Sequence, residues 1–477
     1  MSNSDPQSGS TAAQNANPED SLYSARKKIY VRAAKGVFAN WRWALVWITQ
    51  LLFYGLPWLQ WNDRQAVLLH VVERKFYIFG WVFWPQDVFF LAILLIISAY
   101  SLFFFTAIAG RLWCGYACPQ TVYTEIFMWI EQKIEGDRNK RMRLDKEPMS
   151  GRKAALKSAK FGAWALVALW TGFTFVGYFS PIHDLVASIP TFGFGPWEIF
   201  WILFYGSFTF LFAGVMREQV CKYMCPYARF QGVMFDPDTL IITYDEERGE
   251  PRGARKKGVD PKAVGKGDCI DCGLCVQVCP TGIDIRQGLQ YECIGCAACI
   301  DACDEIMDKM EYPRGLIRYS TENAIKKHWD GKQIVGHVMR PRTLIYGAVL
   351  VAICIAFVWG LATREPLRVD IIRDRATLAR EVQGGLIENV YQLQVMNMTE
   401  EPRVFDVTVD GLEGIRMGGF AGTIEVSPAS MQAVTLQVQV PVEAGEPGSS
   451  NEIHFNISAE DDKNIAVKEK STFLLPR

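Results

Sequence analysis

The chain has 477 residues, 50% of them hydrophobic, and its 50 basic and 51 acidic residues leave a formal net charge of −1. This length allows several domains, and the balanced charge excludes a protein that binds nucleic acid through an overall basic surface. The 13 cysteines occur mostly in short motifs, which favours metal and redox chemistry over a secreted disulfide framework.

Residues 1–36 are predicted to form a disordered cytoplasmic tail, because their first part is polar and has no apolar segment typical of a signal peptide. Five apolar runs that follow are each long enough to cross a bilayer. They are Val37–Leu59, Val88–Ile108, Phe161–Phe179, Trp197–Val215 and Leu344–Leu361. The first run contains Arg42, which we interpret as a side chain that snorkels to the cytoplasmic interface.

Basic residues indicate how these runs are oriented. Lysine and arginine are frequent in the tail, in residues 110–160 and in the connection before the fifth run, whereas residues 180–196 contain neither. Cytoplasmic connections carry the excess of positive charge, so the N-terminus is predicted to be cytoplasmic and the C-terminus periplasmic. The expected location is the inner membrane of a bacterial cell.

Two related cysteine motifs follow the second and the fourth apolar run. They read Cys114-Gly-Tyr116-Ala-Cys118-Pro119 and Cys221-Lys-Tyr223-Met-Cys225-Pro226. Cysteines four residues apart share one face of a helix, so each pair could bind one soft metal ion such as Cu(I). A thiol–disulfide cycle and a third cluster held by all four cysteines are alternatives. A single buried cysteine without chemistry would be unremarkable, but two matched pairs favour a function.

The stretch from residue 269 to residue 303 contains the pattern C-x₂-C-x₂-C-x₃-C twice. This is the spacing of bacterial ferredoxins with two [4Fe–4S] clusters, in which the fourth cysteine of each run binds the other cluster. One cluster is therefore assigned to Cys269, Cys272, Cys275 and Cys303. The other is assigned to Cys293, Cys296, Cys299 and Cys279. Zinc knuckles are the alternative, but two identical runs with Pro280 after the first favour iron.

These features predict a multi-domain membrane protein with a bundle of five transmembrane helices. Residues 37–235 form a four-helix membrane region with both C-x₃-C-P motifs, and residues 236–340 form a linker and the cytoplasmic ferredoxin domain. Residues 341–363 form the fifth helix. Over residues 364–477, alternating stretches such as 391–395 predict about seven strands of a periplasmic immunoglobulin-like β-sandwich.

The whole layout resembles the CcoG/FixG/RdxA family, the accessory proteins of cbb3-type cytochrome c oxidase. The resemblance implies an oxidoreductase that reduces Cu(II) to Cu(I) for assembly of that oxidase, with copper as its substrate. Carried onto this chain, it makes four motif cysteines the catalytic, copper-facing groups and the ferredoxin cysteines the electron carriers. The four are Cys114, Cys118, Cys221 and Cys225.

The expected partners are the lipid bilayer, copper ions, oxidase assembly factors, and a copper chaperone or transporter. The sequence does not identify the electron donor, and it leaves the oligomeric state open, a homodimer included. Two other functions stay open as well. One is a quinol-oxidising electron-transfer subunit of a respiratory chain, and the other is a non-enzymatic assembly scaffold or redox sensor.

Overall fold

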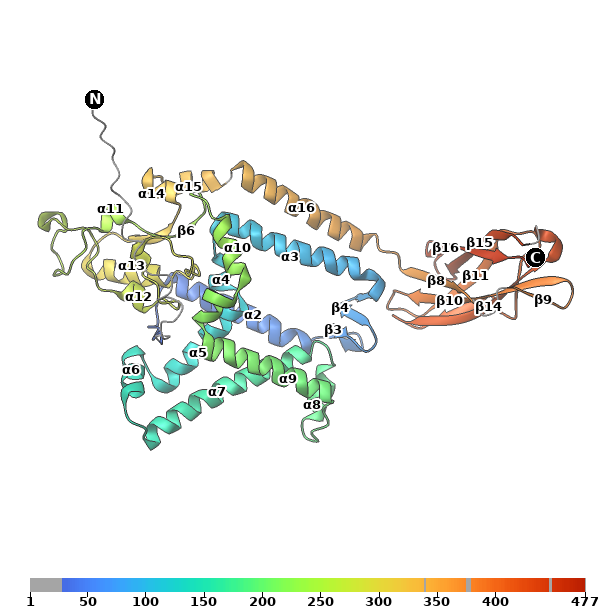
Figure 1. Cartoon of the computed structure of the whole chain (residues 1–477), viewed down its shortest axis with the longest axis horizontal. Helices are drawn as coiled ribbons and strands as arrows, with labels where there is room; N and C mark the ends of the chain where they lie inside the picture. Colours follow the sequence, from blue (N-terminus) through green and yellow to red (C-terminus); the bar gives the residue numbers. More distant parts are fainter. Residues whose placement is uncertain (1–27, 339, 375–378, 446–447, 477) are drawn as a thin grey trace, which may run out of the picture. The chain divides into compact units, whose positions relative to one another are not determined.

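The computed structural model describes residues 28–338, 340–374, 379–445 and 448–476 (Figure 1). Within the tail predicted to be disordered, residues 1–27 lie outside the described residues. The described chain forms two compact units. Unit 1 comprises residues 28–46, 105–167 and 209–338, and unit 2 comprises residues 47–104 and 168–208 with the described residues from 340 to 476.

Among the described residues, four helices are long and apolar enough to cross a membrane. They are Pro85–Ala109, Gly151–Val176, Pro196–Met216 and Pro341–Ala362. They contain α3 (Val88–Ala109), α7 (Gly151–Val176), α9 (Pro196–Thr209) with η3 (Phe210–Met216), and α16 (Pro341–Ala362). The most apolar window of the first helix is 6% buried and that of the last is 0% buried, as expected for surfaces that face lipid.

The remaining predicted span, α2 (Val37–Gly55), is a helix but is not among these four. The prediction that its Arg42 snorkels to a membrane interface is wrong. Arg42 is buried in unit 1, where its Nη1 lies 3.7 Å from Glu125 Oε2 on α5 (Pro119–Glu135). Sequence alone could not show this pair, because the carboxylate comes from a distant part of the chain.

Residues 28–36 are held by unit 1 rather than belonging to a disordered tail. The backbone N–H of Arg32 donates to the carbonyl of Gln277 at 2.8 Å. The Tyr30 hydroxyl donates to Asp145 Oδ2 at 2.7 Å, on α6 (Arg138–Lys146). The prediction of disorder is therefore wrong for these residues, because residues far away in sequence form hydrogen bonds with them.

The ferredoxin module lies in unit 1 and is closed by a pair of antiparallel strands, β6 (Ile241–Tyr244) and β7 (Ile317–Ser320). Short helices separate its cysteine loops. They are α11 (Glu246–Gly249), η5 (Lys262–Val264), α12 (Leu274–Gln277), η6 (Ile285–Gln287) and α13 (Ala298–Met310). After β7 follow α14 (Glu322–Lys326) and α15 (Gly331–Val338).

Asp301 on α13 ties this module to the start of α2. Its carboxylate accepts the backbone N–H groups of Phe38 at 3.1 Å and Ala39 at 2.7 Å. These groups belong to the first turn of α2 and have no partner within the helix. A carboxylate at this position satisfies them and interacts favourably with the helix dipole.

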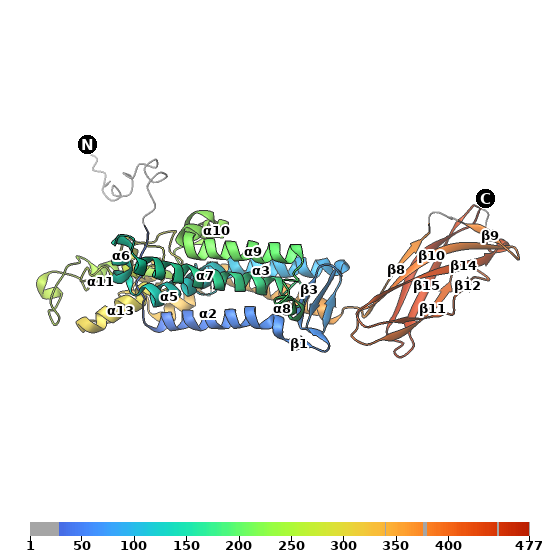
Figure 2. The same ribbon diagram turned by 90° about the horizontal axis from the view of Figure 1, so that it is seen from below.

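Unit 2 ends in a β-sandwich, in agreement with the predicted immunoglobulin-like domain. One sheet has the order β12-β14-β10-β8 with β9 paired to β10, and the other has the order β13-β11-β15-β16. Their strands run close to a common direction (Figure 2). The bounds are β8 (Leu367–Arg373), β9 (Arg380–Val382), β10 (Leu386–Asn397), β11 (Arg403–Asp410), β12 (Arg416–Gly418), β13 (Thr423–Val426), β14 (Met431–Pro441), β15 (Ser450–Ala459) and β16 (Ala466–Leu474). The described residues thus contain nine strands here rather than about seven.

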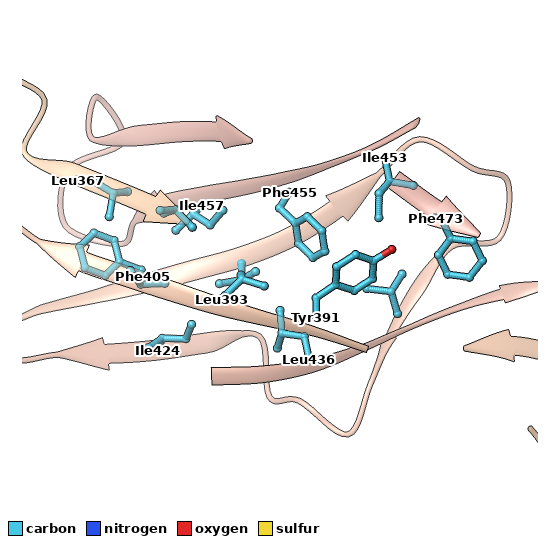
Figure 3. Close-up of a cluster of buried hydrophobic side chains, with 14 of the residues drawn as sticks. Leu367, Tyr391, Leu393, Phe405, Ile424, Leu436, Ile453, Phe455, Ile457 and Phe473 are labelled. Atoms are coloured by element: carbon cyan, nitrogen blue, oxygen red, sulfur yellow. The ribbon is translucent and has the colours of Figure 1, made fainter. Parts of the chain in front are cut away.

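Large apolar side chains from both sheets fill the sandwich (Figure 3). Tyr391 and Leu393 of β10 and Phe405 of β11 are fully buried, as is Phe455 of β15. Alternate residues of each strand therefore point into one shared core, which explains the period-two pattern of the sequence.

The strands between α2 and α3 were not expected from the sequence. They are β1 (Gln60–Trp61), β2 (Arg64–Gln65), β3 (Val67–His70), β4 (Lys75–Ile78) and β5 (Trp81–Phe83). Tyr77 and Trp84 from this segment form a buried cluster with Met396 and Met398 of the sandwich region. These methionine side chains serve packing within unit 2.

Candidate functional site

The two cysteine loops of the ferredoxin module have the same backbone conformation. Asp271 and Gly295 occupy matching positions, with φ of 56° and 70°. Gly273 and Ala297, each directly after the second cysteine of its loop, have φ of 65° and 58°. Left-handed backbone is costly at a non-glycine residue such as Ala297 and is concentrated at functional sites. The repeat in the sequence is therefore also a repeat in the loop geometry.

The cysteines assigned to the second cluster lie together. Cys279, Cys293, Cys296 and Cys299 line one small cavity, to which Cys275 also contributes. Burial raises the pKa of Cys299 well above its usual value, and the neighbouring thiols of Cys296, Cys293 and Cys279 raise it further. Thiols gathered in such a setting lose their protons when a metal binds rather than spontaneously.

The cysteines assigned to the first cluster form a second group. Burial raises the pKa of Cys303 to about 12, and Cys275 and Cys269 contribute after it, with Cys272 a smaller contribution. Cys303, the fourth cysteine of the second run, is thus near the first three cysteines of the first run, as the crossed assignment requires. Cys272 differs from the other seven in being exposed, so this group reaches the surface of the module.

Both groups fit [4Fe–4S] clusters. Among the described residues, no three histidine, cysteine or acidic side chains are close enough to hold a single metal ion. A cubane offers each of its four thiolates a separate iron, so its ligands stand farther apart than those of one ion. Four thiols on two matching loops, largely buried, are the donor set that such a cluster needs.

The C-x₃-C-P cysteines do not share a helix face as predicted. Cys114 lies on α4 (Leu112–Tyr116), but Cys118 is extended, with ψ of 128°, and directly precedes α5. Cys225 is likewise extended, with ψ of 111°, between η4 (Val220–Met224) and α10 (Pro226–Met234). A proline disfavours helical backbone at the residue before it, so each motif bends at its second cysteine.

The bend nevertheless brings the four thiols into one neighbourhood. Burial raises the pKa of Cys114 to about 12, with further contributions from Cys118 and Cys221. Burial also raises the pKa of Cys221 to about 12, followed by the effects of Cys118 and Cys225. The two pairs therefore lie near each other and are together named the four-thiol site below, although no three of these thiols are close enough in the described structure to hold one metal ion.

Two glutamines that were not expected from the sequence connect the motifs to each other. Gln120, two residues after Cys118, donates to the carbonyls of Phe212 at 2.9 Å and Arg217 at 3.2 Å, just before the second motif. Gln231 on α10 is fully buried, and its Oε1 lies 3.5 Å from Cys114 Sγ. A glutamine that follows one motif in the sequence thus contacts the other motif or the residues just before it. No local sequence pattern reveals these contacts.

The four-thiol site lies directly against the second cluster loop. A Cβ atom on Gly115 would come within 2.8 Å of the backbone carbonyl carbon and oxygen of Gly295 and 2.9 Å of the Cα of Cys296. The Tyr319 hydroxyl donates to the carbonyl of Gly295 at 2.7 Å and lies 3.4 Å from the hydroxyl of Tyr116. The first motif and a cluster ligand are therefore in backbone contact.

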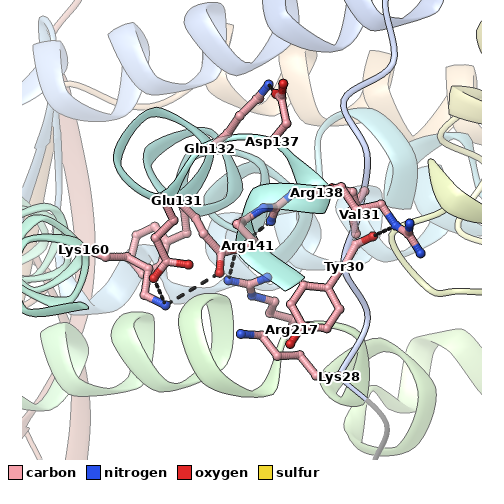
Figure 4. A network of polar contacts seen from close by, with 12 residues as sticks. Lys28, Tyr30, Val31, Glu131, Gln132, Asp137, Arg138, Arg141, Lys160 and Arg217 are labelled. Carbon is pink, nitrogen blue, oxygen red and sulfur yellow. Dashed lines mark hydrogen bonds and ion pairs between the residues drawn. The ribbon is translucent and has the colours of Figure 1, made fainter. Parts of the chain in front are cut away.

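A buried network of charged side chains holds Arg217, which precedes the second motif (Figure 4). Glu131 Oε2 accepts from Arg217 at 2.8 Å and from Arg141 at 3.1 Å, and Lys160 Nζ lies 3.6 Å from Glu131 Oε1. Burial alone would raise the pKa of Glu131, but Arg217, Arg141 and Lys160 outweigh it, so the pKa lies below its usual value. The charged carboxylate holds Arg217, four residues before Cys221, in place.

Comparison with known proteins identifies the family. The chain is 37% identical over 459 residues to the nitrogen fixation protein FixG of Rhizobium meliloti, and the alignment covers 88% of each chain. It is 38% identical to the protein RdxB of Cereibacter sphaeroides, over 91% of this chain and 92% of that one. This chain belongs to the FixG/RdxA family.

Family models match its separate parts. A 4Fe-4S dicluster domain matches residues 216–322, a 4Fe-4S binding domain matches residues 90–136, and the IG-like fold at the C-terminus of FixG matches residues 357–476. A crystal structure of a FixG-related protein from Vibrio parahaemolyticus covers 24% of this chain and 98% of its own, with 22% identity and a TM-score of 0.21. The FixG/RdxA member described here is an iron–sulfur protein of the electron-transfer type.

Proposed function

We propose that this protein reduces Cu(II) to Cu(I) for assembly of a cbb3-type cytochrome c oxidase, with the four-thiol site as the place where copper binds. The observation that carries the proposal is the backbone contact of Gly115 with Gly295 and Cys296. This contact places the four thiols, which are suitable ligands for a soft metal ion, beside the loop that holds ligands of the second cluster. The reaction adds one electron to each copper ion, and when bound, the two clusters supply electrons singly.

The side chains of the four-thiol site suit copper in its reduced state. Thiolates prefer Cu(I) to harder ions, so their binding favours the product of the reduction. The raised pKa values of Cys114 and Cys221 mean that copper displaces protons when it binds. Gln231 and Gln120 keep the two motifs in register before the metal arrives.

In this proposal the protein lies in the inner membrane of a bacterium, with its thiols and clusters on the cytoplasmic side and its sandwich in the periplasm. The apolar helices and the distribution of basic residues support this arrangement. Cu(I) formed in the cytoplasm then needs a copper chaperone or a transporter to reach the oxidase.

Replacement of the four thiols tests the proposal. We expect the variant with Cys114, Cys118, Cys221 and Cys225 changed to serine to lose Cu(II) reduction, measured with the purified protein and a Cu(I)-specific chelator. Cys354→Ser on α16 is the matched control, since it removes a thiol outside every motif and should leave the rate unchanged. Equal rates in the four-serine variant and the parent would refute copper binding by these thiols.

A second candidate is a quinol-oxidising electron-transfer subunit in which the four thiols hold a further iron–sulfur centre. It is favoured by the match of residues 90–136 to a 4Fe-4S binding domain, because the cysteines in that range are Cys114 and Cys118. This candidate predicts that quinol reduces the clusters in membranes, and that the four-serine variant contains less iron than the parent.

A further inference from the structure

A basic loop lies beside the first cluster group. Residues 252–266 contain six basic residues and one acidic residue, Asp260. The six are Arg252, Arg255, Lys256, Lys257, Lys262 and Lys266. Arg252, Lys256, Lys257 and Lys262 are exposed. Exposed ion pairs such as that of Lys257 with Glu311 neutralise little of this charge.

The loop has a defined position relative to the cysteines. Gly267 N–H donates to the carbonyl of Pro251 at 3.0 Å, which closes the base of the loop. Gly253 N–H donates to the carbonyl of Cys269 at 3.1 Å. The Tyr312 hydroxyl donates to the carbonyl of Val259 at 2.6 Å, midway along the loop. The positive charge is therefore fixed next to a ligand of the first cluster.

The first cluster group, to which Cys269 belongs, also contains the most accessible cluster ligand. Cys272 is exposed, whereas the other seven ferredoxin cysteines are buried or half-buried. The second group, by contrast, is covered by the first motif through Gly115. In both views of the ribbon, the yellow-green loop after α11 lies at the end of unit 1 away from α5 and α10 (Figures 1 and 2). The basic loop thus marks an outward face of the electron carrier.

We propose that residues 252–266, together with the surface around Cys272, dock an acidic soluble protein that carries single electrons. Complementary charge steers such a partner and orients it toward the accessible cluster. In the transfer, a flavin hydroquinone anion of the partner would give up one electron and become the neutral semiquinone. Cys269, Cys272, Cys275 and Cys303 would hold the cluster that accepts this electron. The inference rests on the electron-transfer part of the proposed function and not on copper.

Anionic lipid is the other partner that a basic loop could meet. In both views the loop lies away from α5 and α10, the helices that come after the apolar helices and the cysteine motifs (Figures 1 and 2). This position favours a soluble partner. The two partners differ in their consequences, because a loop covered by lipid headgroups cannot bind an acidic protein.

The test uses the full-length protein, in detergent and in nanodiscs with neutral or anionic lipid, and oxidised flavodoxin as the acidic probe. We expect binding that weakens as salt is added. The variant with Lys256, Lys257 and Lys262 changed to glutamine should associate about tenfold more slowly at low ionic strength. Changing Lys326, Lys327 and Lys332 on and after α14 to glutamine removes the same charge elsewhere and should have no effect.

Reduction of the clusters provides a second readout. Flavodoxin hydroquinone should reduce the loop variant more slowly than the parent, whereas dithionite should reduce both to the same extent. Equal flavodoxin binding by the loop variant and the parent would overturn the proposal. Flavodoxin binding that is lost only in nanodiscs with anionic lipid would also overturn it, because the loop would then contact lipid. The four-serine variant should still bind flavodoxin. Failure of the copper proposal can therefore be distinguished from failure of the docking proposal, which the loop variant tests.

Discussion

At the scale of single residues, the absence of a side chain at Gly115 is what allows the first motif to touch the second cluster loop. The nearest atoms to a Cβ there belong to the backbone of Gly295 and Cys296, which cannot rotate away. Electron tunnelling weakens steeply as the gap between two centres widens. The closeness of the four-thiol site to the clusters therefore depends on this glycine.

Gly115→Ala should push the first motif away from Gly295 and slow Cu(II) reduction several-fold. Both clusters should still assemble, because no ligand changes, and EPR of the dithionite-reduced protein checks this. Gly162→Ala on α7, where a Cβ meets nothing within 4 Å, is the matched control. A full reduction rate in the Gly115 variant would show that the contact has no part in the reaction.

Asp301 offers a prediction about stability at the same scale. Asp301→Ala removes the acceptor for the N–H groups of Phe38 and Ala39 and should destabilise the protein by about 1 kcal/mol, the typical cost of losing a helix cap. Thermal unfolding in detergent measures the change, and Asp301→Asn should restore most of it. An unchanged midpoint in the alanine variant would mean that solvent replaces the cap.

At the scale of elements, the two C-x₃-C-P motifs are held together by side-chain contacts. Gln120, which follows the first motif, binds the segment before the second motif, and Gln231, which follows the second motif, contacts Cys114 of the first. The cysteine spacing predicted two groups of ferredoxin cysteines, and the structure has two such groups. The assignment of single cysteines to clusters stays a prediction. The cysteine spacing also suggested a shared helix face for each C-x₃-C-P pair, which is wrong because proline bends the backbone at Cys118 and Cys225. The roles of Gln120 and Gln231 were not predicted. Buried polar contacts between distant segments leave no periodic signal in the chain.

The Glu131 network predicts a dependence on pH. Its carboxylate has a lowered pKa in the folded protein, so the stabilisation is complete above the ordinary pKa of 4.5 and is lost as pH falls below it. Thermal unfolding of the parent should therefore shift to lower temperature as pH falls below this value. Glu131→Gln should be less stable at neutral pH and should show a smaller shift. Parallel pH profiles for the two proteins would contradict this account.

At the scale of the whole molecule, the chain combines apolar helices, a ferredoxin module and a β-sandwich, and its sequence predicted all three classes of element. Apolar length identified four helices that the structure also has, and alternation identified the sandwich. The strands between α2 and α3 were missed because they are short, at two to four residues each. Arg42 was misjudged because its partner Glu125 is far away in sequence.

The proposed topology makes a prediction of its own. An alkaline phosphatase reporter fused after residue 477 should be active, because it requires the periplasm, whereas the same reporter inserted in the exposed turn at Gly258 should be inactive. The opposite pattern would place the clusters in the periplasm and exclude reduction of copper in the cytoplasm.

The most direct test of the central claim is the metal content of the protein purified without oxygen, then incubated with Cu(I) and desalted. The parent should contain about eight iron atoms per chain, four for each cluster, and bound copper. The four-serine variant should keep its iron and lose its copper. A protein without iron, or a four-serine variant that loses iron and not copper, would contradict the account.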